Sequence, residues 1–248
     1  MSGIITAMYT STLVIPALNE SKSIRAFLES AITQSKPFNT IVVVIDHATT
    51  DDTKQICDEY TEFGVQTIIN SPSGVSRARA AGFEVSDSDI IVSSDADSVL
   101  PFNWHKNILK SFEDYPSSSL IYGSVELDPH EVRASIHLLA KLGFRIFLRT
   151  AHSIGSPNPN GMNFAIKREI YNKINGFDVK RTTAEDIDLA KRASQHGKIT
   201  YQPSIIVFTS ARRLRGMGYR KFLSHHMKNY IGYNFAGQSS DNFKAYRD

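Results

Sequence analysis

Three pairs of aspartates separated by a single residue could bind a cation, and their positions distinguish them. One pair, Asp95 and Asp97, directly follows an apolar run at Ile90–Ser93, whereas the other two pairs follow no such run. Two neighbouring carboxylates repel each other unless a cation or hydrogen-bond donors offset their charge. Magnesium and manganese prefer one or two carboxylates together with phosphate oxygens. Asp95 and Asp97 are therefore candidates for a metal and phosphate site, or alternatively for the cap of a helix that begins near Pro101.

The elements that must position these carboxylates alternate between strand and helix in the first half of the chain. Four short apolar runs read as buried strands, and apolar residues at helical spacing mark the three segments between them. The expected strands are Thr12–Pro16, Ile41–Ile45, Val65–Ile69 and Ile90–Ser93. This order predicts a mostly parallel sheet flanked by helices. Ligands of such sheets bind beyond the carboxyl ends of the strands, which is where Asp95 and Asp97 lie.

The second half of the chain is less regular. The expected elements are strands at Leu120–Leu127 and Ile199–Phe208, a basic amphipathic helix at Val132–Arg149, a loop at Ser156–Gly161, and helices near Arg168–Ile174 and Glu185–His196. We expect one domain over 1–248, with a nucleotide-binding half at about 11–100. An acceptor-side half at about 101–210 and a helical, basic tail at 211–248 complete it.

The composition excludes several classes of protein. The 248 residues are 41% hydrophobic and 21% charged, with a formal net charge of +3, well below what a dedicated nucleic-acid binder carries. Cys57 is the one cysteine, so a disulfide within the chain and a zinc site built from cysteines are excluded. The N-terminus does not read as a signal peptide, and no apolar run approaches the ~20 residues that span a bilayer. The cytoplasm is the expected compartment.

Five short motifs occur in one order along the chain. They are Val14-Ile-Pro-Ala-Leu-Asn-Glu20, Asp46-His-Ala-Thr-Thr-Asp-Asp-Thr53, Ala78-Arg-Ala-Ala-Gly82, Asp95-Ala-Asp97 and Glu185-Asp-Ile-Asp-Leu189. This arrangement resembles the family 2 glycosyltransferases, from about Leu13 to about Phe208. The resemblance implies a single α/β domain of the fold called GT-A. It also implies transfer of a sugar from a nucleoside diphosphate donor, in polysaccharide or glycolipid synthesis, to an acceptor that the sequence does not identify.

The resemblance also implies a role for each matching residue. The residues expected to contact the nucleotide are Pro16, Ala17, Asn19 and Glu20 in the first loop, Asp46 and His47 after the second strand, Arg79, and Asp95. Asp97, with Asp95, matches the site for Mg²⁺ or Mn²⁺ and the diphosphate. Asp186 matches the catalytic base, with Glu185 next to it. An inverting transfer needs a base for the acceptor hydroxyl and a cation for the leaving group. By themselves, Glu185 and Asp186 could also be acids in the first turn of a helix.

Two positions depart from the family's pattern. His47 stands where the family commonly has a second aspartate, which leaves the preference for a nucleotide base open, since a histidine accepts a hydrogen bond in one tautomer only. The segment 209–213 stands where the family often has a metal-binding histidine. There, Arg212 and Arg213 could bind the diphosphate, or could form an exposed basic turn. In the acceptor-side loop, Gly161 and Asn163 match, and Asn163 could hold a sugar hydroxyl.

The basic helix at 132–149 has three possible roles. It could contact an anionic membrane and bring the enzyme to a lipid-linked acceptor, pack against a second subunit of a homo-oligomer, or pack on the sheet. Two other functions also stay open. A sugar nucleotidyltransferase would want a glycine-rich first loop, and Pro16–Glu20 contains no glycine. A nucleotide-sugar-binding module without turnover would retain the fold but not the chemistry.

Overall fold

The computed structural model describes residues 9–217, and eight strands in this part of the chain form one sheet. The strands are β1 (Ser11–Ala17), β2 (Thr40–Asp46), β3 (Val65–Asn70), β4 (Ile90–Ser93), β5 (Ser98–Val99), β6 (Ser118–Leu127), β7 (Phe164–Lys167) and β8 (Lys198–Thr209). The helices are α1 (Ile24–Ile32), α2 (Thr53–Asp58), α3 (Val75–Glu84), α4 (Trp104–Asp114), α5 (Ala134–Ser153), α6 (Arg168–Lys173), α7 (Glu185–Ala193) and α8 (Arg212–Met217), with a short 3-10 turn, η1 (Thr61–Phe63).

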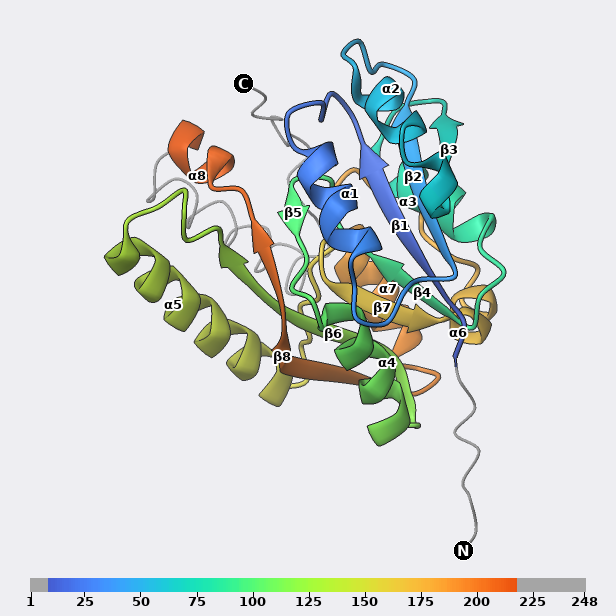
Figure 1. Cartoon of the computed structure of the whole chain (residues 1–248). Coiled ribbons are helices and arrows are strands. Elements are labelled where there is room, and N and C mark those ends of the chain that lie inside the picture. Colours follow the sequence, from blue (N-terminus) through green and yellow to red (C-terminus); the bar gives the residue numbers. More distant parts are fainter. Residues whose placement is uncertain (1–8, 218–248) are drawn as a thin grey trace, which may run out of the picture.

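The sheet is mostly parallel, as the sequence predicts. Its strand order is β3-β2-β1-β4-β7-β6-β8-β5 (Figure 1). The pairs β1–β2, β2–β3, β1–β4 and β6–β8 are parallel, whereas β7 lies antiparallel between β4 and β6, and β5 lies antiparallel to β8. Neither β5, which has only two residues, nor β7, which lies between the expected loop at 156–161 and the expected helix near 168–174, is predicted from the sequence. The parallel half places the ends of β1, β2 and β4 side by side.

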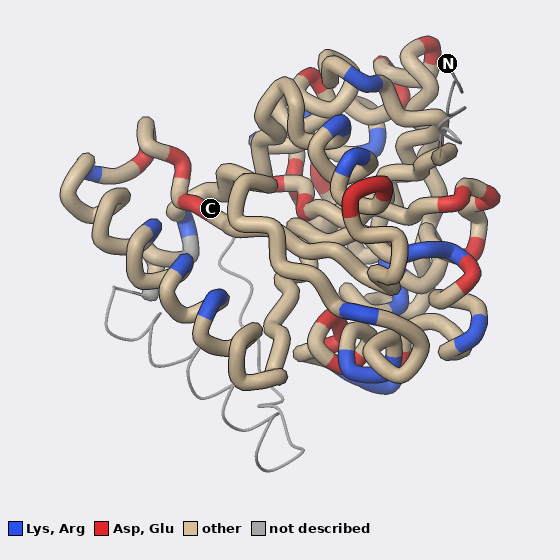
Figure 2. Tube along the Cα trace, turned by 90° about the horizontal axis from the view of Figure 1, so that it is seen from below, with Lys and Arg blue, Asp and Glu red and all other residues tan. Residues whose placement is uncertain are grey.

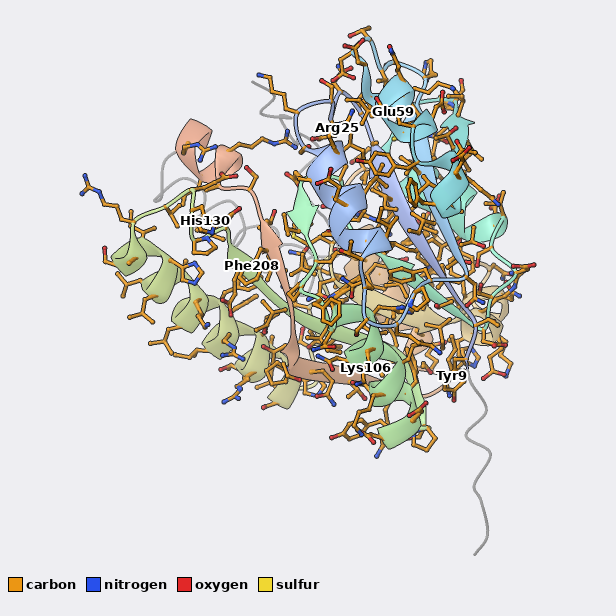
Figure 3. The ribbon with its side chains drawn as sticks, in the orientation of Figure 1. Tyr9, Arg25, Glu59, Lys106, His130 and Phe208 are labelled. Atoms are coloured by element: carbon orange, nitrogen blue, oxygen red, sulfur yellow. The ribbon has the colours of Figure 1, made fainter. Side chains whose placement is uncertain are left out.

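Both faces of β1, β2 and β4 are buried, which explains their apolar runs, whereas the edge strand β3 is partly exposed. Along β1, Leu13 and Ile15 join the core cluster that contains residues of α1, α2 and α4, whereas Val14 joins the cluster that contains residues of α3, α6 and α7. In Figure 1, α1 and α4 accordingly lie on one side of the sheet and α7 on the other. At the surface, α1 is joined to the end of α2 by a hydrogen bond that Arg25 donates to Glu59 at 2.9 Å (Figure 3).

Helix α5 packs on the sheet along one face only. Leu148 and Ala151 are buried, and Arg145 donates to the carbonyl of Pro203 at 2.7 Å. The other face exposes Leu138 and Leu139, by 62% and 66%, together with other apolar side chains. In Figure 2, α5 is the long helix at the left, and its charged residues are all basic. Packing on the sheet is thus confirmed for one face, while contact with a membrane or a second subunit stays a prediction.

The described residues do not test several of the predictions made from the sequence. Within residues 9–217, no helix combines the length and the apolar character that a membrane span needs. The cytoplasmic compartment stays a prediction, as does the division of the domain into two functional halves. Most of the predicted C-terminal tail, residues 218–248, lies outside the described residues.

Candidate active site

The first candidate loop follows β1 at the carboxyl edge of the sheet. Pro16 lies in a central strand, but the pairing of β1 with β4 ends at Val14, so its missing N–H costs no ladder bond on that side. Ala17, the last strand residue, is buried. Asn19 adopts a φ of 52°, a left-handed conformation that asparagine tolerates, and its Oδ1 accepts from the backbone N–H of Thr50 at 2.8 Å. The loops after β1 and β2 are thereby held together.

Asp46, at the end of β2, is an almost fully buried carboxylate. It accepts hydrogen bonds from Ser73 Oγ at 2.6 Å and from the backbone N–H groups of Ala48 at 2.9 Å and Gly74 at 3.2 Å. Burial disfavours the charged form, but these donors outweigh it and hold the pKa of Asp46 below its usual value. The side chain of His47 is 47% exposed, and its Nδ1 lies 3.5 Å from Asp46. Asp46 is thus ionised and bonded within the protein, whereas the imidazole of His47 is accessible, and their contact with a nucleotide stays a prediction.

Asp95 and Asp97 follow β4, and the structure excludes the alternative that they cap a helix. Helix α4 begins at Trp104 with Asn103 as its N-cap, and β5 separates that helix from the two aspartates. The side chain of Asp95 is 20% exposed and that of Asp97 is 8% exposed. Both carboxylates therefore lie at the edge of the sheet, in the loop between β4 and β5.

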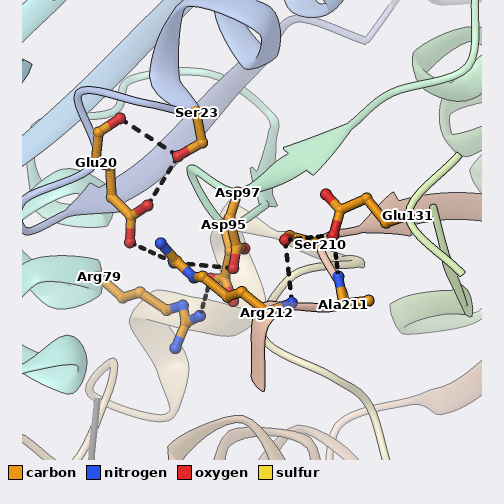
Figure 4. A network of polar contacts seen from close by, with 9 residues as sticks. All are labelled: Glu20, Ser23, Arg79, Asp95, Asp97, Glu131, Ser210, Ala211 and Arg212. Carbon is orange, nitrogen blue, oxygen red and sulfur yellow. Dashed lines mark hydrogen bonds and ion pairs between the residues drawn. The ribbon is translucent and has the colours of Figure 1, made fainter. Parts of the chain in front are cut away.

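A guanidinium from the far end of the described chain faces Asp97. Arg212 Nη2 lies 2.7 Å from Glu20 Oε1 and 3.0 Å from Asp97 Oδ2, so it joins the first loop to the aspartate pair (Figure 4). The segment leading into α8 is itself anchored, because Glu131 accepts from Ser210 Oγ and from the backbone N–H of Ala211. Arg212 is therefore not in an exposed basic turn. The side chain of Arg213 lies outside the described residues.

The residues around Asp97 fit a divalent cation of the magnesium or manganese type. Within residues 9–217, no cluster of three or more His, Cys, Asp or Glu side chains could hold a metal by itself. Mg²⁺ and Mn²⁺ do not require such a cluster, since one or two carboxylates and the oxygens of a bound diphosphate suffice. Asp97 already faces a positive charge, that of Arg212.

Arg79 is paired inside the protein. Its side chain is 3% exposed, and its fork donates to Asp95 Oδ1 at 2.6 Å and to Glu185, while Nε donates to Ser93 Oγ at 3.2 Å. All three nitrogens thus have partners within the chain. Arg79 bridges two carboxylates of the candidate site, and its contact with the nucleotide stays a prediction.

Asp186 lies in the first turn of α7, after Ala184 in a left-handed conformation. Its Oδ2 accepts from the backbone N–H of Gly161 at 2.6 Å and its Oδ1 from that of Ile187 at 2.8 Å. Burial, and next the charge of Glu185, raise the pKa of Asp186 to about 7, against the lowering effects of Arg79 and the two N–H groups. A carboxylate with such a pKa can take up a proton near neutral pH.

Glu185 and Asn163 both make their contacts inside the protein. Glu185 is 6% exposed and is held in an ion pair with Arg79. Asn163 is fully buried, accepts from Trp104 Nε1 at 3.0 Å, and donates to the carbonyls of Ser124 and Ile205. These contacts give both residues a part in the fold, while the catalytic role of Glu185 and the acceptor-side role of Asn163 stay predictions.

Sequence reasoning missed three residues of this network. Ser93 bridges Arg79 and Gly161, since its Oγ accepts from one and donates to the carbonyl of the other at 2.7 Å. Glu131 anchors the segment that carries Arg212. Ser73 donates to Asp46, and only its place in the Ser-Pro-Ser-Gly turn could have pointed to it, because such turns offer hydroxyl and N–H donors.

The model of the family described as glycosyl transferase family 2 matches residues 12–175, about two thirds of the chain. The chain belongs to glycosyl transferase family 2. The hyaluronan synthase of Streptococcus pyogenes is 31% identical over 116 residues, which cover 43% of this chain and 27% of the synthase. The succinoglycan biosynthesis protein ExoA of Rhizobium meliloti is 23% identical over 212 residues, which cover 82% of this family 2 chain and 64% of ExoA. The chain thus spans about a quarter of one relative and under two thirds of the other.

Solved structures of glycosyltransferases share the fold. The mannosyltransferase PcManGT of Pyrobaculum calidifontis, in complex with GDP-Man and Mn²⁺, superposes with a TM-score of 0.72 at 22% identity, over 95% of this chain and 67% of the other. TarS 1–349 of S. aureus, in complex with UDP-GlcNAc, superposes with a TM-score of 0.64 at 17% identity, over 81% of this chain and 58% of the other. The fold of this family 2 chain is the GT-A fold that the motifs imply.

Proposed function

We propose that this family 2 chain transfers a sugar from a nucleoside diphosphate donor to an acceptor hydroxyl, with inversion at the sugar carbon. The observation that carries the proposal is the setting of Asp186. It is a shielded carboxylate with a pKa of about 7, fixed by two backbone N–H groups, and Arg79 links its neighbour Glu185 to the aspartate pair after β4. A base of that kind beside a cation-binding edge is what an inverting transfer requires.

In the proposed reaction each side chain has a separate task. Asp97 and Asp95 would hold Mg²⁺ or Mn²⁺, which when bound offsets negative charge on the departing diphosphate. Asp186 takes the proton from the acceptor hydroxyl, and the N–H groups of Gly161 and Ile187 keep its carboxylate in one orientation. Arg212 pairs with phosphate oxygens once it leaves its carboxylate partners, because a guanidinium fork matches them.

The donor is a nucleoside diphosphate sugar of a kind that solved relatives hold. PcManGT was crystallised with GDP-Man and TarS with UDP-GlcNAc, so guanosine and uridine donors are the first to test. Asp46 and the half-exposed His47 lie at the sheet edge where the nucleotide base would be held. No glycine occurs in the loop Pro16–Glu20, which argues against a nucleotidyltransferase that grips a triphosphate.

The proposal is tested by release of the nucleoside diphosphate. The protein is incubated with UDP-GlcNAc or GDP-Man and Mn²⁺, with water serving as acceptor, and free UDP or GDP is measured. We expect release with one donor, its loss in EDTA, and its loss in both Asp97→Asn and Asp186→Asn. Metal-dependent binding of a nucleotide with no release above background would support a binding module without turnover and would contradict the proposal.

A further inference from the structure

Four separate segments of the chain meet at the guanidinium of Arg79. The arginine itself comes from α3, Asp95 from the loop after β4, and Glu185 from the start of α7. The fourth segment is the loop before β7, where the backbone of Gly161 lies against the arginine head. The two carboxylates are 20% and 8% exposed and the arginine 3%, so water competes little for these contacts. Arg79 is therefore the point where the aspartate pair and the helix of Asp186 are joined.

Gly161 completes this junction through its backbone. Its carbonyl accepts from Ser93 Oγ, which in turn accepts from Arg79 Nε, and its N–H donates to Asp186. A methyl group added at Gly161 would lie 2.6 Å from Cζ of Arg79 and 2.8 Å from its Nη1, closer than atoms can pack. The φ of Gly161 is not in the left-handed region. The glycine is needed for space, since any side chain would displace the guanidinium.

We propose that Arg79 and Gly161 act together as a positioning unit, which holds the carboxylates on the metal side and on the base side of the site in one arrangement. This inference rests on the proposed function. One end of the unit fixes Asp95, the neighbour of Asp97, and the other end fixes Glu185 and the carboxylate of Asp186. Arg79 is a positioning residue, because its buried fork bonds to Asp95 and Glu185 and acts on the site through them.

The chemistry of arginine suits this task. Its planar fork directs separate N–H groups to two carboxylates and keeps its charge at every physiological pH. A lone nucleotide contact would need an exposed head, which Arg79 lacks. A merely structural ion pair would not need the backbone of Gly161 to link the arginine to Asp186. The unit explains both features.

Gly161→Ala tests the inference, with Gly143→Ala as the matched control. A methyl group at Gly143, in α5, meets no atom within 4 Å, so this variant should behave as wild type. The measurements are the Mn²⁺-dependent binding of UDP and GDP by calorimetry, kcat for release of the nucleoside diphosphate, and thermal unfolding. In Gly161→Ala we expect kcat to fall by about 100-fold, the loss typical of a ~1 Å misplacement. We expect metal-dependent nucleotide binding to weaken several-fold in the same variant, because Asp95 moves with Arg79.

Three results would overturn the inference. They are a Gly161→Ala variant that matches Gly143→Ala, one that loses binding alone, and one that melts earlier but has normal kcat and affinity per folded molecule. If Gly161→Ala does not fold, Ser93→Ala removes the bonds that join Arg79 to Gly161 without adding volume, and it should weaken both readouts in the same direction. If wild-type protein neither binds a nucleotide with Mn²⁺ nor releases one, the proposed function itself fails. Failure of the variants alone sinks only the inference.

Discussion

Replacement of Arg212 by alanine should remove the positive charge that lies between the carboxylates of Glu20 and Asp97. The arginine lies 2.7 Å from Glu20 and 3.0 Å from Asp97, and the three side chains are only 17%, 12% and 8% exposed. Its pKa is raised by these partners against the lowering effect of burial, so the guanidinium is charged throughout the usual pH range. Without it, Glu20 and Asp97 lose the positive charge that lies between them.

The expected cost can be bounded from the burial of the three groups. Removing one partner of a fully buried ion pair costs about 3–5 kcal/mol, because the other charge is left uncompensated. An exposed pair contributes about 0–1 kcal/mol. Since water reaches the rim of this cluster, we expect Arg212→Ala to lose about 2 kcal/mol of unfolding free energy in EDTA, between those limits. Arg215→Ala is the control on the same helix, because Arg215 is 53% exposed and pairs with Glu131, so its loss should stay below about 1 kcal/mol.

The effect of Mn²⁺ on stability should show whether Glu20 and Asp97 form a cation site or only an ion pair with Arg212. Urea unfolding of wild type, Arg212→Ala and Arg215→Ala is measured in EDTA and in MnCl₂, without nucleotide. Mn²⁺ should restore more stability to Arg212→Ala than to the other two proteins, because the vacated carboxylates attract it. With a nucleotide present, the same variant should bind less tightly, since the guanidinium no longer meets the diphosphate. The reasoning is refuted if Arg212→Ala is as stable as Arg215→Ala in EDTA and gains no more from Mn²⁺.

Substitutions at three further positions test separate parts of the site. Because the base must be ionised and its pKa is about 7, kcat should rise with pH through neutrality, and Asp186→Asn should abolish turnover while nucleotide affinity by calorimetry stays unchanged. Because the pKa of Asp186 is raised from 3.8 to about 7, its protonated form stabilises the fold at low pH, and this stabilisation is lost as pH rises from about 4 to about 7. Asp186→Asn should therefore gain stability relative to wild type over that range and keep a constant difference above pH 7; an equal difference at all pH values would argue against the raised pKa. Asn163→Ala should lower unfolding free energy by about 2–3 kcal/mol, because the partners of its amide lose their bonds; undiminished stability with weaker acceptor binding would support its acceptor role. Arg79→Lys should lower kcat nearly as much as Arg79→Met, since a lysine lacks the fork that reaches two carboxylates; full activity of the lysine variant would show that charge alone suffices.

Much of the nucleotide-binding half could be predicted from the sequence, for a physical reason. Strands buried on both faces show as continuous apolar runs, so β1, β2 and β4 could be placed correctly, and the edge strand β3 was placed from its apolar residues. The antiparallel insertion of β7 was not predicted, because its pairing with β4 and β6 depends on contacts with distant parts of the chain. Local sequence patterns predict the individual helices and strands, whereas the order of the strands in the sheet depends on contacts between distant parts of the chain.

The sequence suggests candidate side chains of the site more readily than it suggests their contacts. The order of motifs indicates Asp97 and Asp186 as candidates, and Arg212 was a candidate for the diphosphate or for an exposed basic turn. The burial of Arg79 between Asp95 and Glu185 could not be read from the sequence, because it depends on where α7 packs. Likewise, an asparagine after a Pro/Asn-rich loop looks exposed, and only the packed structure shows Asn163 inside the protein.

Calorimetry of nucleotide binding tests the central claim most directly, that Asp97 holds a divalent cation beside a nucleoside diphosphate. UDP and GDP are titrated into wild type and Asp97→Asn, each in Mn²⁺ and in EDTA. The account predicts that wild type binds one nucleotide more tightly in Mn²⁺, and that Asp97→Asn loses this difference while its thermal unfolding remains cooperative. Equal affinity in Mn²⁺ and EDTA for wild type, or an unchanged metal effect in the variant, would contradict it.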